Sequence, residues 1–225
     1  MQMQVEVDNE TPIDSSTQTR QRLLDASEAL FAERGFRGAS VRDITQAAAC
    51  NLASVNYHFG GKSNLYREVI MRRLTELRAG RLGAVDGAMQ RAETEPTVEL
   101  LLRSFTIAFL EPLVQSSAGR RWVNLMSREM LDPQLPRDMF RTEMVLPIHQ
   151  ALGHALQRLC PRLSPEVTEL CVDSLIGQLV YIERLHRCTE LSTTPADLLF
   201  SLPARVDHTV RFTAAAIEVL ASEKG

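Results

Sequence analysis

The sequence lacks the features of a secreted, membrane-spanning or disulfide-bonded protein. Residues 1–18 contain neither a basic segment nor an apolar core, so no signal peptide is expected there. No run of eighteen apolar residues occurs, and no transmembrane helix is expected. The four cysteines form no CxxC pair and no regular spacing, which is typical of a reducing compartment. These absences together predict a cytoplasmic protein that does not enter the membrane.

The usual signatures of catalysis and metal binding are missing too. The chain contains no glycine-rich phosphate loop, no nucleophile elbow and no paired-carboxylate motif. His186 and Cys188 are close in sequence, but two ligands do not make a zinc site. We therefore expect no enzymatic activity, no metal and no cofactor.

The net charge is small, but the charges are unevenly distributed. The 25 basic and 28 acidic residues leave a formal charge of −3, so overall basicity does not indicate a nucleic-acid partner. Residues 15–92 nevertheless carry twelve Lys or Arg against seven Asp or Glu, while residues 1–14 and 93–225 are net acidic. A positive segment attracts phosphate through steering and counterion release. An excess of this size also occurs by chance, so charge alone leaves the partner open.

Apolar residues recur at helical spacing along most of the chain. No stretch of strand length alternates with period two, so an all-α fold is predicted. We expect a disordered acidic tail over residues 1–17, a helix-turn-helix domain over 18–66 and a larger helical domain over 67–225. The helices expected after residue 62 cover 63–90, 97–114, 120–130, 136–159 with a kink at Pro147, 165–187, 197–202 and 203–222.

The segment 40–66, SVRDITQAAACNLASVNYHFGGKSNLY, predicts two short helices joined by a tight turn. Ser40 with Asp43 three residues later is typical of a capping box at the start of the first helix. Asn51 is a suitable N-cap for the second helix. In that helix Leu52, Val55 and Phe59 repeat at i, i+3 and i+7, which gives the helix an apolar face. The residues off this face are polar and include no acid, which suits insertion into the DNA major groove.

Several motifs follow one another in a fixed order over residues 19–70: Arg34-Gly35-Phe36, Ser40-Val41-Arg42-Asp43-Ile44, Val55-Asn56-Tyr57-His58-Phe59, Lys62 and Leu65-Tyr66. Together they resemble the DNA-binding domain of the TetR family of bacterial repressors. The resemblance implies an all-helical homodimer whose first domain binds operator DNA and whose larger domain dimerises and binds an effector. Residues 127–133 and 177–181 are similar to the C-terminal domain of the CecR-like branch, which names no ligand.

Two positions depart from the family pattern. The family usually has Gly where this chain has Ala49, and commonly has Tyr where this chain has Asn56. If the turn needs a positive φ at position 49, Ala is strained there by roughly 1 kcal/mol.

Ten residues are candidate DNA contacts. An amide such as that of Asn56 pairs bidentately with adenine, although a merely solvated position explains it equally well. Tyr57 and His58 suit phosphate contacts, unless they pack on neighbouring helices. Lys62 matches a phosphate-contacting lysine of the family. The full set is Ser40, Arg42, Thr45, Leu52, Ala53, Ser54, Asn56, Tyr57, His58 and Lys62.

The effector side is less defined. The resemblance implies a pocket for a small molecule whose identity the sequence does not give, and core packing is the simpler explanation for each candidate residue. The candidates are Phe105, Phe109, Trp122, Met126, Arg128, Met144, His149, Gln178 and Tyr181. Besides Arg128, the cations considered as partners of an anion are Arg103 and Arg184.

The leading hypothesis is a ligand-responsive regulator of transcription, a repressor that binds a palindromic operator as a dimer. The helices over 165–187 and 203–222 are expected to form the dimer interface. The alternative is a small-molecule carrier or enzyme with a vestigial helix-turn-helix. The sequence does not separate a repressor from an activator. Oxidation of Cys50 in the turn is conceivable, but a small buried apolar side chain is the simpler explanation.

Overall fold

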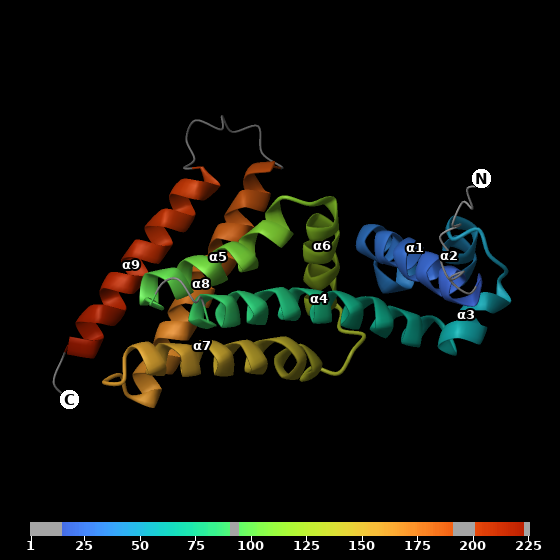
Figure 1. Cartoon of the computed structure of the whole chain (residues 1–225). Coiled ribbons are helices and arrows are strands. Elements are labelled where there is room, and N and C mark those ends of the chain that lie inside the picture. Colours follow the sequence, from blue (N-terminus) through green and yellow to red (C-terminus); the bar gives the residue numbers. More distant parts are fainter. Residues whose placement is uncertain (1–14, 91–94, 191–200, 223–225) are drawn as a thin grey trace, which may run out of the picture. The chain divides into compact units, whose positions relative to one another are not determined.

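The computed structural model describes residues 15–90, 95–190 and 201–222, and all regular structure in these ranges is helical (Figure 1). The chain divides into two compact units, Met1–Val69 and Ile70–Gly225. Most of the tail expected over 1–17 and most of the short helix expected over 197–202 lie outside the described residues. Ser15, Ser16 and Thr17 are helical, so the first helix begins earlier than the tail prediction allowed.

The first unit contains α1 (Ser15–Gly38), α2 (Val41–Ala47), α3 (Ala53–Phe59) and the first two turns of α4 (Lys62–Gln90). Helix α1 packs against both α2 and α3. Three aromatic rings fix this packing, since Tyr66 lies edge-on to Phe31 at 5.0 Å and to Phe36 at 5.1 Å. Gly35 has φ 73°, which breaks the regular helix and lets Phe36 turn back onto this cluster.

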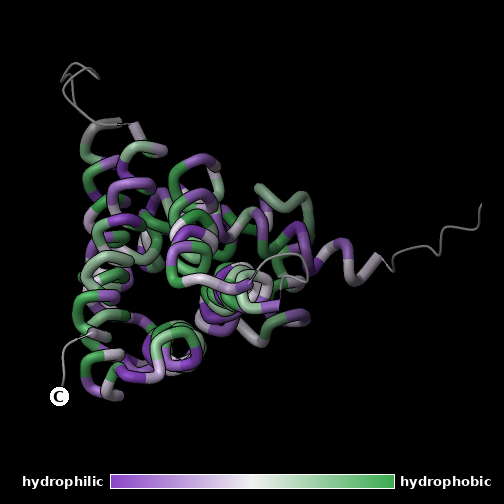
Figure 2. Tube along the Cα trace, turned by 60° about the vertical axis from the view of Figure 1, so that its left-hand side comes forward, coloured by the Kyte–Doolittle hydropathy of each residue, from purple (hydrophilic) through white to green (hydrophobic). Residues whose placement is uncertain are grey.

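The second unit is built around α5 (Val98–Val114), which contacts α6 (Ser117–Leu131), α7 (Leu146–Leu159), α8 (Pro165–Glu190) and α9 (Leu202–Ser222). The predicted start of α8 is confirmed, because the Ser164 hydroxyl accepts from the Val167 N–H at 3.2 Å. Hydrophilic and hydrophobic residues alternate along each helix (Figure 2), as expected for helices with one apolar face.

Two boundaries in the second unit were predicted wrongly. Residues 116–119 are not a loop, because Ser116 caps α6 by accepting from the Gly119 N–H at 2.9 Å. No α-helix starts at Pro136; a five-residue π-helix, η1 (Arg141–Val145), comes directly before α7. Pro147 then falls in the first turn of α7, where a missing N–H is tolerated, so it is not the mid-helix kink that we expected.

Within the described ranges, none of the helices combines the length and the apolar character of a membrane span. The same residues bring no three potential metal ligands together.

Candidate DNA-binding surface and effector site

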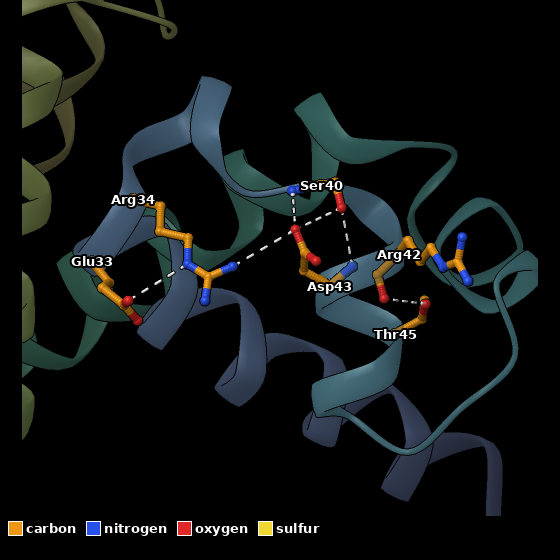
Figure 3. A network of polar contacts seen from close by, with 6 residues as sticks. All are labelled: Glu33, Arg34, Ser40, Arg42, Asp43 and Thr45. Atoms are coloured by element: carbon orange, nitrogen blue, oxygen red, sulfur yellow. Dashed lines mark hydrogen bonds and ion pairs between the residues drawn. The ribbon is translucent and has the colours of Figure 1, made fainter.

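The start of α2 is held by the predicted capping box (Figure 3). The Ser40 N–H and hydroxyl both donate to Asp43 Oδ2, at 3.1 and 2.7 Å, while the Asp43 N–H donates to the Ser40 hydroxyl at 3.1 Å. The two hydrogen bonds from Ser40, with smaller help from Arg34 and Arg42, lower the pKa of Asp43. Because its hydroxyl is engaged in this box, Ser40 acts first as a cap and fixes the position from which Arg42 projects.

The turn between α2 and α3 contains the strained residue that the sequence suggested. Ala49 has φ 49°, and it is the only non-glycine residue with positive φ in the described ranges. The Cys50 N–H donates to the Thr45 carbonyl at 3.0 Å, which closes the turn. Asn51 then accepts from the Ala53 N–H at 3.0 Å through its side chain, so it caps α3 as expected, although the helix itself begins at Ala53.

Helix α3 presents its polar side to the surface. Asn56 is exposed, Tyr57 is 81% exposed and His58 is half-buried against the Tyr57 ring, with a centroid distance of 4.9 Å. Ala53 is also exposed and Ser54 is half-buried. Val55 and Phe59 face the core, as their spacing predicted. The exposed side of α3 therefore carries an amide and a phenol but no charge.

One sequence-based expectation about this surface is wrong. Thr45 is only 4% exposed, and its hydroxyl donates to the Arg42 carbonyl of its own helix at 3.1 Å (Figure 3). It therefore packs in the core and does not point outward. Leu52 is 56% exposed, which is compatible with a DNA contact, although its dihedral angles are already helical.

Two cations lie on the helices before and after α3 in the chain, Arg42 on α2 and Lys62 on α4. The Arg42 side chain is exposed and points away from the capping network (Figure 3). Lys62 is the first residue of α4, and its Nζ lies 4.5 Å from the centroid of the Phe36 ring. This burial against the ring lowers the pKa of Lys62. The Gly60-Gly61 turn places Lys62 there, since Gly60 with φ 72° caps α3 in the left-handed region.

The candidate effector residues lie in different surroundings. Phe105, Phe109, Trp122 and Met144 are buried, and Phe105 and Phe109 pack ring to ring at 6.0 Å. Met126 is half-buried. Arg128 is exposed and His149 lies 3.6 Å from Asp173. Gln178 and Tyr181 instead line a groove of about 490 Å³ between α8 and α9. A second cavity of about 240 Å³, lined by α5, α6 and α8, contains none of the nine.

Comparison with known proteins agrees with the architecture. Residues 23–69 match the family described as bacterial regulatory proteins, tetR family, and residues 98–217 match the C-terminal domain of the HTH-type transcriptional dual regulator CecR. The second match alone covers more than half of the chain. The chain belongs to the TetR family of DNA-binding transcriptional regulators.

Individual relatives of this TetR-family chain match over shorter segments. YttP of Bacillus subtilis, named as an HTH-type transcriptional regulator, is 31% identical over 128 residues, which is 56% of this chain and 58% of YttP. The HTH-type transcriptional repressor KstR2 of Rhodococcus jostii is 41% identical over 58 residues, 26% of this chain and 28% of KstR2. The chain thus matches less than two thirds of the length of either relative.

Solved structures share the TetR-family fold over nearly the whole chain. GusR of Salmonella enterica has a TM-score of 0.62 at 19% identity, covering 94% of this chain and 99% of GusR. The TetR-family regulator PfmR of Thermus thermophilus has a TM-score of 0.55 at 18% identity, covering 92% of this chain and 98% of PfmR. At such identities the likeness concerns the fold.

One residue of this TetR-family chain escaped the sequence analysis. The buried stripe of α4 contains Leu74, Leu77, Val85 and Ala88, and Arg81 occupies the position between Leu77 and Val85 at the same helical spacing. Arg81 is 6% exposed. A charged residue at helical spacing within an apolar stripe could have indicated it, but the inward face predicted from the sequence ended at Leu77.

Proposed function

We propose that this TetR-family regulator is a repressor that binds a palindromic operator as a homodimer and is released by a small-molecule effector. The observation that carries the DNA contact is the acid-free face of α3, which exposes Asn56 and Tyr57, with Arg42 on the preceding helix and Lys62 on the following one. Such a helix reads base edges in the major groove, while flanking cations hold the phosphates. Relatives named as repressors, such as KstR2 and AcnR, support the direction of regulation. A protein that binds chromosomal DNA acts in the cytoplasm.

The residues of this surface take different roles in the proposal. Asn56 reads a base, Arg42 and Lys62 contact phosphate, and Tyr57 fixes the register. His58 supports the Tyr57 ring, Ser40 positions Arg42, and the exposed residues Leu52 and Ala53 approach the bases or sugars, with Ser54 beside them.

The proposed dimer uses exposed apolar residues on α8 and α9. Leu170 and Tyr181 are each 63% exposed and recur on one side of α8, with Gly177 between them. Phe212 and Val219, 60% and 57% exposed, are seven residues apart on α9 and share a face. Two such helices pair with their copies as a four-helix interface, which is isologous and therefore matches a palindrome. The half-sites then lie about 34–36 Å apart.

The DNA contacts are tested by selecting an operator from random DNA and measuring affinity against salt concentration. Lys62→Ala should weaken binding to all sequences and reduce the salt slope by about one unit, because one phosphate contact is lost. Asn56→Ala should instead relax preference at a single base pair. If both variants bind the selected operator with the affinity and salt dependence of the wild type, the proposed contacts of α3 and Lys62 with DNA are wrong. If the protein retards no DNA in a gel-shift assay at low salt, the result would favour the alternative of a small-molecule carrier.

The dimer is tested by sedimentation of Phe212→Glu beside the control Leu131→Glu. Leu131 is 87% exposed at the end of α6, away from the proposed interface. A charge at position 212 would be desolvated in the interface, so we expect a monomer with weak operator binding, whereas the control stays dimeric. A dimeric Phe212→Glu protein would contradict this interface.

A further inference from the structure

Arg81 stands out in the second unit because its side chain is charged and buried, and among the described residues no carboxylate pairs with it. Its side chain is buried on α4, and burial alone lowers the pKa of this guanidinium to about 10. Within the part of the chain that the structure describes, no carboxylate contacts it. A buried charge is costly unless it is paired and hydrogen-bonded, so this position favours the arrival of an anion from outside the chain.

The contacts that Arg81 does make are weak ones. Its Nη1 donates to the Met144 sulfur at 3.3 Å, and a thioether is a poor acceptor. Its guanidinium carbon lies 3.9 Å from the centroid of the Phe109 ring, a cation–π contact. Its Nε has no hydrogen-bond partner among the residues that the structure describes. The Nε donor is therefore unsatisfied, and the arginine fork presents its donors in the geometry that suits a carboxylate or a similar oxyanion.

A neighbouring arginine shows what a paired site on the same helix is like. Arg78, three residues earlier on α4, donates to the Glu143 carboxylate at 2.8 Å and to the Glu143 carbonyl at 2.6 Å. Glu143 and Met144 are consecutive residues of η1. Within η1, the Glu143 carboxylate therefore pairs with Arg78, whereas Met144 offers Arg81 only a thioether sulfur.

The surroundings of Arg81 indicate the rest of the ligand. Phe109 covers the guanidinium and Phe105 packs against Phe109, which provides an aromatic wall for an apolar body. Thr106, one turn before Phe109 on α5, is fully buried, and its hydroxyl has no hydrogen-bond partner within the described ranges. Methionine side chains are flexible and π-helical segments are common at functional sites, so Met144 is suited to move aside.

We propose that Arg81 binds the anionic group of the effector, a small molecule with a carboxylate or similar oxyanion on an apolar body, and that this anion replaces the Met144 sulfur. The inference rests on the proposed function, because it assumes that the second unit binds an effector. It adds the chemical class of that effector and the residue that selects it. Arg81 and Lys62 lie on one continuous helix, α4, so displacement of Met144 acts on the helix that also carries a proposed phosphate contact.

The test uses the full-length protein without DNA, so that it does not depend on operator binding. Calorimetric titration measures the affinity for phenylacetate, cinnamate, octanoate and decanoate, each beside its uncharged primary amide. We expect at least one acid to bind wild type and its amide to bind at least about tenfold more weakly, the loss expected for a hydrogen-bonded charge. Arg81→Met should bind acid and amide equally weakly, while Arg81→Lys should retain part of the preference for the acid.

Arg103→Met is the matched control for the titration. Arg103 is paired with Asp207 at 2.8 Å and Glu99 at 3.2 Å, so its loss should leave the preference for the acid intact. The melting temperature of the ligand-free protein gives a second readout. Since no described carboxylate pairs with Arg81, Arg81→Met should not lower the melting temperature of the ligand-free protein.

Three outcomes would overturn the proposal: no acid of the panel binds, the amide binds as well as its acid, or Arg81→Met keeps the preference for the acid. A lower melting temperature for Arg81→Met without ligand would also count against it, because Arg81 would then be structural. If the protein instead fails to bind any DNA, the proposed function is wrong while the titration result stands.

Discussion

Replacing Ala49 by glycine should stabilise the first unit, because the present residue sits in a conformation that side chains disfavour. The left-handed region costs a residue with a Cβ roughly 1–2 kcal/mol, and Ala49 has φ 49°. Part of the relief of this strain is offset, because glycine makes the unfolded chain more flexible and so lowers the free energy of unfolding by roughly 0.5–1 kcal/mol. Ala49 is exposed, so no core contact is lost. We expect a net gain of about 0.5–1 kcal/mol.

The measurement is the calorimetric transition of the first unit in the full-length protein. For a domain of this size, about 1 kcal/mol moves the midpoint by about 4–8 °C, so Ala49→Gly should raise it by about 2–8 °C. Ala29→Gly is the matched control, because Ala29 is exposed inside the regular part of α1. There the same substitution should cost about 1 kcal/mol. If Ala49→Gly lowers the midpoint as Ala29→Gly does, the strain argument is refuted.

Three further predictions follow from the local geometry. Ser40→Ala should destabilise the first unit by about 1 kcal/mol in urea titration, because α2 loses its cap. The pKa of Asp43 is lowered in the folded state, so its ionised carboxylate stabilises the fold at pH values above the ordinary pKa of 3.8. This stabilisation is lost as the pH falls through the lowered pKa. The difference in unfolding free energy between wild type and Ser40→Ala should therefore become smaller in acid. Gly119→Ala should cost about 1–3 kcal/mol, because its Cβ would lie 2.2 Å from the Pro112 carbonyl oxygen, whereas Gly153→Ala meets nothing closer than 3.8 Å and should be tolerated. Thr45→Val should leave operator affinity unchanged in a gel shift, since the hydroxyl bonds within its own helix.

The sequence by itself determined the features that depend on neighbouring residues. The capping box of Ser40 and the cap at Ser164 were both predictable, because each depends on hydrogen bonds within a few residues. The left-handed turn at Ala49 was raised only as a possibility, by the glycine that the TetR family usually has there. The helical stripes also follow from a period of 3.6 residues. The resemblance of residues 19–70 to the TetR family added the domain order and the role of α3.

Only the tertiary structure decided which of the side chains at helical spacing are buried. Leu52 is exposed although its dihedral angles are helical and it shares its spacing with Val55, and Thr45 is buried because α1 and α3 both pack on α2. The position of Arg81 depends on Phe109 and Met144, which come from distant parts of the chain. A helical stripe indicates which face is inward, but it does not indicate whether a carboxylate from another helix meets the charge that lies there. That depends on long-range packing, which local patterns do not encode.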